Sequence, residues 1–281
     1  MADTTAPQAT SASADKAPSG FQMSPKTIER IMPWAVVIGL FLFWELAVWV
    51  FDFPQFILPA PSVIFEAMWQ WRVPILDNAA QTAFTTVVGF AIAIVFGLVT
   101  GIIIGSSSLI YNGFYPVLIG FNSIPKVAVV PILVIWFGIG SIPAIITAFL
   151  ISFFPILVNV ATGIATVEPE LKDVLRALGA SKRDIIVKVG IPRSLPYFFA
   201  SLKIAITVAF VGSIIAETVA SNKGIGHLMM VASSRFEVPL VFAGLLVTAI
   251  MGVIMYVIAI MIEKRMTGWS VREMDGPTAG G

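Results

Sequence analysis

The chain has 281 residues, of which 58% are hydrophobic and only 12% are charged, and its formal net charge is +1. A soluble domain normally has about 25% charged residues, so this composition excludes an ordinary soluble protein and indicates an all-α integral membrane protein. Because cysteine is absent, disulfides, thiolate catalysis and cysteine-ligated metals are excluded as well.

The chain begins with a segment, residues 1–24, that is rich in Ala, Ser, Thr and Pro. We expect it to be a disordered tail, because it has too few apolar residues to offset the entropy of ordering. The first apolar run starts only near Ile31, which is too late for a cleaved signal peptide and predicts a retained helix over about 31–51.

Residues 52–78 then break the apolar pattern with prolines and charged residues. Within them, Ser62–Trp71 has apolar residues at helical spacing and two tryptophans, as in a helix that lies at a membrane interface. A short helix without lipid contact fits this segment equally well.

The stretch from Asn78 to Pro125 contains no charged residue and is too long for one span, since about 20 residues cross a bilayer. We expect a break at residues 105–113, with one helix near 80–105 and another near 114–137 that contains three prolines. Further helices are predicted near 142–165, 196–218 and 238–262. Six spans is the preferred count, five or seven are alternatives, and residues 266–281 form a C-terminal tail.

The lysines and arginines are distributed unevenly over the loops. With six spans, both termini and the polar loop at 166–195 share one side, which holds twelve of the 17 basic residues. The other side holds only Arg72, Lys223 and Arg235. By the positive-inside rule, the loop and both tails are therefore predicted to be cytoplasmic.

The polar loop itself has the pattern of two short helices. Its first part has an apolar stripe at i, i+3, i+4 and i+7 and then a glycine, Gly179, where a left-handed helix cap favours this residue. Ser181, followed three residues later by Asp184, predicts the start of a second helix that stops before Pro192. This hinged pair suits a docking surface, and a connector that only lies on lipid headgroups is the alternative. The stripe consists of Leu171, Val174, Leu175 and Leu178.

The spacing in this loop resembles the EAA loop of permeases of ATP-binding cassette (ABC) importers, E-A-A-x3-G-x9-I-x-L-P. Asp173, Val174 and Leu175 take the E-A-A positions, Gly179 takes the glycine position, and the last proline is Pro192. The triplet itself departs from the motif. Five more segments resemble the nitrate, sulfonate and taurine branch of these permeases, namely Leu58–Met68, Ile124–Gly140, Phe153–Asn159, Leu178–Ser181 and Ala216–Gly226.

The resemblance implies a type I importer (MetI-like) fold over residues 25–265, located in a bacterial inner membrane, with 166–195 as the cytoplasmic coupling loop. It implies a path for a small, anionic solute such as nitrate, a sulfonate or taurine. It also implies two copies of an ATP-binding subunit, a second permease copy, surrounding lipids and a periplasmic or lipid-anchored solute-binding protein, but no nucleic acid. The implied coupling residues are Asp173, Val174, Leu175, Arg176, Leu178, Gly179, Ala180, Ser181 and Pro192.

The sequence lacks a G-x-x-x-x-G-K-[ST] loop, so we expect no ATPase site and no cofactor in this chain, with ATP bound by the partner. Because ionisable residues are expensive inside a bilayer, those within the spans are candidates for function. Lys126 and Glu217 are the candidates for the translocation path or a gate, although Lys126 fits the cap of a broken helix as well. Lys203 is expected to snorkel towards the cytoplasm, and Glu45 to have a polar partner. Because His227 is the single histidine and cysteine is absent, we expect no metal site.

A secondary transporter and a non-transporting membrane scaffold are the rival interpretations. A secondary transporter would show repeated halves with ionisable residues near the midplane, and no convincing repeat is present. A scaffold would stimulate no ATP hydrolysis.

Overall fold

A computed structural model describes residues 25–267, and every regular element among these residues is a helix. The chain divides into two compact units, the first ending at Phe51 and the second beginning at Asp52. The first unit contains helix α1 (Pro25–Phe51), which begins six residues before the predicted start at Ile31. The tail predicted at 1–24 lies outside the described residues, as does the tail predicted at 266–281 except for its first two residues, which belong to the last helix, at 238–267.

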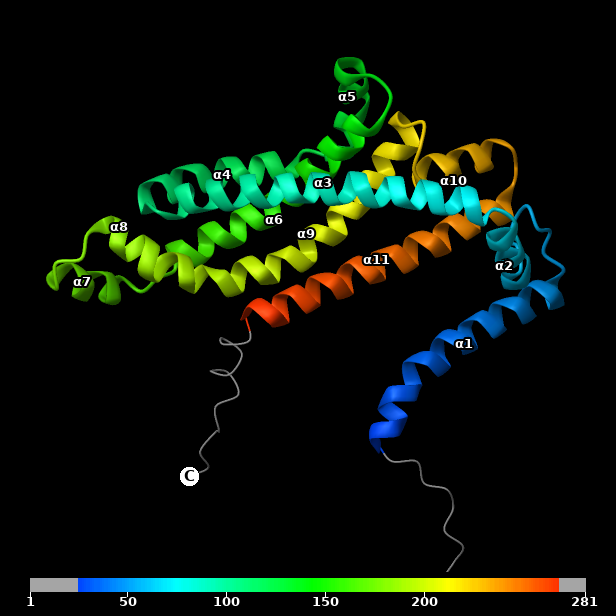
Figure 1. Cartoon of the computed structure of the whole chain (residues 1–281), viewed down its shortest axis with the longest axis horizontal. Helices are drawn as coiled ribbons and strands as arrows, with labels where there is room; N and C mark the ends of the chain where they lie inside the picture. Colours follow the sequence, from blue (N-terminus) through cyan, green and yellow to red (C-terminus); the bar gives the residue numbers. More distant parts are fainter. Residues whose placement is uncertain (1–24, 268–281) are drawn as a thin grey trace, which may run out of the picture. The chain divides into compact units, whose positions relative to one another are not determined.

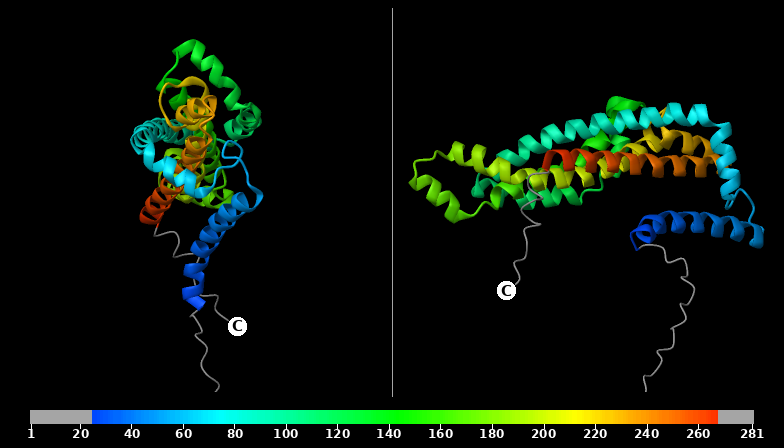
Figure 2. Two further views of the ribbon diagram at one scale, coloured as in Figure 1. Left: turned by 90° about the vertical axis from the view of Figure 1, so that its right-hand side faces the viewer. Right: turned by 60° about the horizontal axis from the view of Figure 1, so that its bottom comes forward.

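The second unit is built around three long helices, α3 (Arg72–Gly105), α6 (Ser141–Ala165) and α9 (Ile191–Ala220), which run side by side (Figures 1 and 2). Their shared core contains Ile156 and Val160 of α6 and Phe198 of α9. Helix α3 approaches α6 closely because glycines face it: a Cβ on Gly97 would lie 2.8 Å from Ile156. Small residues that let two backbones approach are typical of helix pairs in membranes.

Five helices among the described residues are long and apolar enough to span a bilayer, including α11 (Val238–Thr267). A sixth span is counted if α4 (Ser108–Ser123) and the segment Lys126–Phe137, which contains α5 (Val130–Phe137), are taken together. This pair is bent by 72°, so the single helix predicted near 114–137 is wrong, although one of its three predicted proline breaks, Pro125, lies at the bend. An all-helical membrane protein with five or six spans is confirmed.

Some predicted boundaries are wrong for an identifiable reason. Helix α3 begins at Arg72 rather than near residue 80, because Pro74 falls in its first turn, where no backbone N–H is needed. The predicted break at 105–113 shrinks to Ser106 and Ser107, since α4 starts at Ser108.

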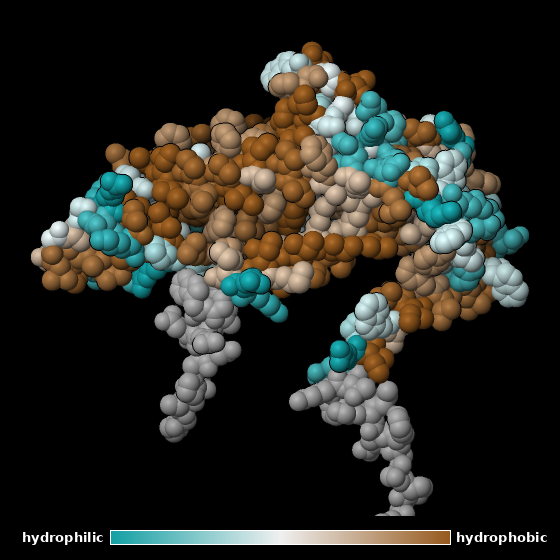
Figure 3. Space-filling view, in the orientation of Figure 1, coloured by the Kyte–Doolittle hydropathy of each residue, from teal (hydrophilic) through white to brown (hydrophobic). Residues whose placement is uncertain are grey.

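The second unit has two polar ends with an apolar region between them. One end carries α2 (Pro61–Gln70) and α10 (Ile225–Ser234), and the other carries α7 (Pro169–Ala177) and α8 (Lys182–Ile185) (Figure 1). On the face shown in Figure 3, hydrophilic residues gather towards these ends and hydrophobic residues fill the middle. This arrangement suits a unit that crosses a bilayer along its long helices. We name the two ends the α2–α10 end and the α7–α8 end.

Candidate functional site

The α7–α8 end contains the loop that the sequence singled out, and it holds two short helices as predicted. Helix α7 is closed by a Schellman motif, in which the Gly179 N–H donates to the Arg176 carbonyl at 2.9 Å and the Ala180 N–H donates to the Leu175 carbonyl at 2.9 Å. Gly179 has φ +87°, the left-handed conformation that this motif requires. The glycine signal in the sequence therefore identified a real helix end.

Helix α8 is capped by Ser181, whose Oγ accepts a hydrogen bond from the Asp184 backbone N–H at 3.1 Å. The Ser181 hydroxyl also donates to Asp184 Oδ2 at 2.5 Å. This is a variant of the capping box, because the acidic side chain bonds the serine hydroxyl rather than the backbone N–H. The predicted start of the second helix is confirmed.

The predicted end of that helix before Pro192 is wrong. A π-helical turn, Ile186–Gly190, connects α8 directly to α9, which contains Pro192 in its first turn. In a regular α-helix the proline ring would collide with the carbonyl four residues earlier, and a π-turn at this point changes that register. The loop is therefore shorter than predicted, and α8 lies on the same continuous helical path as α9.

Helix α7 presents two different faces. Val174 and Leu178 are 56% and 79% exposed, so half of the predicted apolar stripe faces outwards, whereas Leu171 and Leu175 are half-buried. The charged residues lie on another side, where the Arg176 guanidinium contacts Asp173 Oδ1 at 2.9 Å. The loop is closed at its base by Arg193, which contacts Glu168 at 2.8 Å. Helix α7 is thus held in place with two large apolar side chains exposed.

Glu217 lies in a buried polar cluster near the opposite end of α9, and its side chain is only 1% exposed. Thr82 Oγ1 donates to its Oε2 at 2.7 Å, and the Gly226 backbone N–H donates to the same oxygen at 3.2 Å. The hydroxyl groups of Thr85 and Ser213 lie 3.1 and 3.5 Å from Oε1. One carboxyl group therefore joins α3, α9 and the start of α10.

The turn between α9 and α10 is fitted tightly around this carboxyl group. Gly224 has φ +111°, and a Cβ built on it would lie 2.2 Å from Glu217 Cδ. The Gly224 N–H donates to Asn78 Oδ1 at 2.7 Å, and the Ile225 N–H donates to Thr82 Oγ1 at 2.9 Å. The N–H groups of Gly224, just before α10, and of Ile225, its first residue, are thus bonded to side chains of α3.

Lys126, the other candidate for the path, is half-buried at the bend between α4 and α5. Its Nζ donates to the Asn122 carbonyl at 2.5 Å and to Asn122 Oδ1 at 2.7 Å. The ammonium also lies 6.0 Å from the centre of the Phe154 ring on α6. The contacts with the last turn of α4 are those of a helix cap, and the ring contact shows that the side chain also approaches α6.

Lys203 has a partner that the sequence reasoning missed, because its Nζ contacts Glu263 of α11 at 2.9 Å. Glu45 is half-buried within α1. Among the described residues, no group of three or more His, Asp or Glu side chains is arranged to hold a metal ion.

The polar partners of Glu217 were also missed, yet the sequence carried a signal for them. Thr82 and Thr85 are three residues apart in a run without charges, which places their two hydroxyl groups on one face of a helix. A lone carboxyl group in another span needs such donors, because an unsatisfied polar group in the bilayer is costly.

The chain matches the family described as binding-protein-dependent transport system inner membrane component over residues 93–268. It is 30% identical to the riboflavin transport system permease protein of Chloroflexus aurantiacus, with 82% of this chain and 87% of the relative covered. It is 26% identical to the taurine transport system permease protein of Escherichia coli, with 83% and 87% covered.

A solved structure of the MetNI methionine ABC transporter in an inward-facing conformation resembles the fold, with a TM-score of 0.61 and 18% identity, covering 70% of this chain and 97% of the solved one. The family match spans more than half of the chain. The chain therefore belongs to the family of inner-membrane components of binding-protein-dependent transport systems, and it is an ABC importer permease.

Proposed function

We propose that this chain forms the translocation path for a small anionic solute and that a partner ATPase drives it by docking on α7. The observation that carries this proposal is the exposure of Val174 on α7 and of Leu178 at its C-cap, in a segment of otherwise charged character. Exposed apolar side chains that lie together and are bordered by polar residues are a feature of surfaces that bind another protein. The Schellman turn at Gly179 and the cap at Ser181 fix the angle at which α7 is presented.

The ATPase partner supplies ATP binding and hydrolysis, and this chain has no cofactor of its own. Each permease copy offers one α7, so two copies of this chain with two ATP-binding subunits form the simplest assembly. In this assembly the α7–α8 end, both tails and the docking surface are cytoplasmic, as the distribution of lysines and arginines predicts.

The α2–α10 end then faces the solute-binding protein. A cavity of about 390 Å³ at this end is lined by Glu66, Gln70 and Trp71 of the α2 region and by Glu237 before α11. Arg72 and Lys223 lie at this end as well, at the start of α3 and in the turn before α10. A polar surface of mixed charge suits a partner that must bind and release during each transport cycle.

The docking surface is tested by V174D/L178D, which places two negative charges where α7 is apolar. We expect co-purification of the ATPase to fall at least about tenfold, because burying a charge in an apolar interface is strongly unfavourable. The matched control is R183D, which changes the net charge by the same amount at an exposed position of α8. Docking on α7 would be ruled out if V174D/L178D co-purified as much ATPase as the wild type. It would also be ruled out if R183D lost as much ATPase as V174D/L178D.

The rival functions are separated by transport in proteoliposomes that contain the complete complex. Uptake that requires ATP inside and the binding protein outside supports the ABC assembly. Uptake that follows an ion gradient without ATP supports a secondary transporter, and hydrolysis that solute and binding protein fail to stimulate supports a scaffold.

The anionic class of solute is proposed from Lys126 at the bend of the α4–α5 span, where a cation would face an anion passing along α6. In this proposal the positive charge of Lys126 attracts the anionic solute. K126M should therefore lower ATP-dependent uptake of nitrate or an alkanesulfonate about tenfold, whereas K126R should retain most of this uptake. Riboflavin, which is uncharged, serves as the comparison solute. Equal anion uptake by K126M and the wild type would leave Lys126 as the cap of α4 alone.

A further inference from the structure

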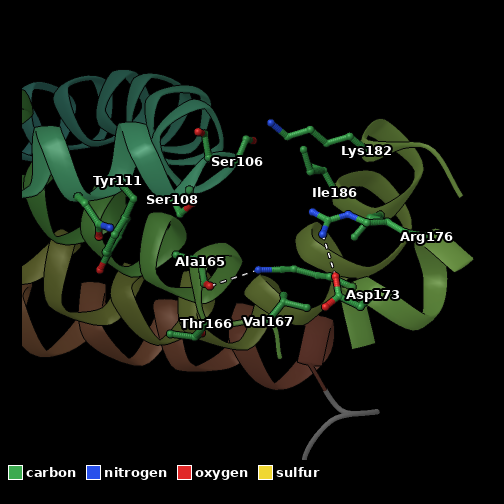
Figure 4. Close-up of a pocket in the computed structure, with 15 residues that line it drawn as sticks. Ser106, Ser108, Tyr111, Ala165, Thr166, Val167, Asp173, Arg176, Lys182 and Ile186 are labelled. Carbon is green, nitrogen blue, oxygen red and sulfur yellow. Dashed lines mark hydrogen bonds and ion pairs between the residues drawn. The ribbon is translucent and has the colours of Figure 1, made fainter. Parts of the chain in front are cut away.

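A cavity of about 680 Å³ lies behind α7, between the two short helices and the ends of α3 and α6 (Figure 4). Ser106 and Ser108 stand on one side of it, and Lys182 and Arg176 stand on the other, as Figure 4 shows. Ala165 at the end of α6 forms its base. The docking surface of α7 does not line this cavity, because neither Val174 nor Leu178 is among its lining residues.

The lining of the cavity carries an excess of positive charge. Three cations line it, Lys172, Arg176 and Lys182, but only one carboxylate does, that of Asp173, which contacts Arg176 at 2.9 Å. Lys172 Nζ reaches the Ala165 carbonyl at 3.5 Å and, within the described part of the chain, neither it nor Lys182 has a carboxylate within 4.0 Å. The cavity therefore faces two lysines whose charges the described chain leaves uncompensated.

Two other cations of the same loop are paired with carboxylates, whereas Arg183 on the exposed surface of α8 has no carboxylate within 4.0 Å among the described residues. Lys188 contacts Asp184 at 2.9 Å, and Arg193 contacts Glu168 at 2.8 Å. An exposed lysine gains little free energy from an ion pair. An unpaired surface lysine is therefore not by itself evidence of a binding site. Two unpaired lysines that line the same cavity produce a positive electrostatic potential in it, and this potential attracts an anion.

The opposite wall offers hydrogen-bonding groups rather than charges. Ser107 and Ser108 line the cavity, and Ser107 makes no side-chain cap bond to α4. In proteins, hydroxyl and ammonium groups donate hydrogen bonds to phosphate oxygens. Ile185 and Ile186 add an apolar portion to the lining, so the cavity suits an anion that carries an organic group.

We infer that this cavity binds a phosphate ester, in particular the headgroup of an anionic phospholipid of the adjacent leaflet. The cavity lies where α3 ends, and the exposed apolar side chains of Val99, Ile103 and Leu109 precede or follow the serines that line it. These side chains would contact the acyl chains of the lipid while its headgroup lies against Lys172 and Lys182. Basic pockets between helices at the cytoplasmic face of a membrane bind such headgroups.

The bound headgroup braces α7 from the side opposite to its docking surface, because Lys172 and Arg176 contact the lipid while Val174 and Leu178 face away. This consequence for coupling rests on the function proposed above. The binding itself does not, and it is measured without any ATPase.

The test uses the full chain purified in detergent and the double variant K172Q/K182Q, which keeps polar side chains but removes both charges. Native mass spectrometry counts phosphatidylglycerol and phosphatidylcholine retained from a mixed bilayer. We expect the wild type to retain phosphatidylglycerol in preference, and the variant to lose roughly tenfold or more of this preference, because each cation near an anionic headgroup contributes several-fold. The matched control is K264Q/R265Q, which removes two exposed cations at the end of α11.

Two competition arms distinguish the sources of the phosphate group. Displacement by a short-chain phosphatidylglycerol but not by inorganic phosphate assigns the site to lipid, and displacement by both assigns it to any phosphate anion; either result supports the site. Equal retention by the wild type and K172Q/K182Q, or an equal loss in K264Q/R265Q, overturns it. Thermal unfolding of each variant shows that it is folded, and intact lipid binding beside failed ATPase docking would reject the proposed coupling alone.

Discussion

Replacing Glu217 with alanine is expected to destabilise the purified chain by about 2–4 kcal/mol, because the buried donors that face this carboxyl group would lose their acceptor. The Gly226 N–H and the Thr82 hydroxyl both donate to Oε2, and the side chain is 1% exposed, so water cannot readily replace it. The truncation also leaves a cavity between α3 and α9. The measurement is thermal unfolding in detergent, followed by tryptophan fluorescence.

Two further variants show whether the loss arises from the hydrogen bonds. E217Q keeps the shape of the side chain but presents an NH2 group to donors, so we expect an intermediate loss. E66A removes an exposed carboxylate that accepts a bond from Gln70 at 3.1 Å, and it should unfold like the wild type. If E217A were as stable as E66A, the cluster would not hold α10 against α3.

Replacing Gly179 with valine is expected to lower co-purification of the ATPase and solute-stimulated hydrolysis about tenfold, while the permease still inserts into the membrane. The left-handed conformation at φ +87° costs an L-residue about 1–2 kcal/mol, and a β-branched residue more. No atom lies within 4 Å of a Cβ built on Gly179, so the effect arises from the backbone rather than from a clash within the chain. Without this turn, the Schellman motif opens and α7 is no longer held.

G179N is the matched variant, because asparagine tolerates the left-handed conformation. We expect G179N to retain most of the coupling if the backbone conformation is what matters. If G179N lost as much coupling as G179V, the partner would instead have to pack so closely against this position that no side chain is tolerated there. Wild-type coupling in G179V would reject a role of this turn in docking altogether.

Much of the coupling loop was predictable because its signals are local. A glycine after an apolar stripe and a serine three residues before an acidic residue act through hydrogen bonds with adjacent backbone groups, so the end of α7 and the start of α8 followed from them. The continuation of α8 into α9 was not predictable by the same reasoning. Pro192 normally marks a break, but a π-turn at Ile186–Gly190 joins α8 to α9, and Pro192 lies in the first turn of α9.

The sequence by itself determined that the chain is an all-helical membrane protein, which segments are long enough to span, and where the charged loop lies, because apolar length, charge and turn residues act along the chain. Only the tertiary structure decided which groups meet. It brought Glu217 to Thr82, residues 135 positions apart, and paired Lys203 with Glu263. It also placed Lys172 and Lys182 around one cavity beside Ser106 and Ser108. Such contacts depend on how helices pack against one another. The hydropathy of a single helix does not identify the helices that pack against it.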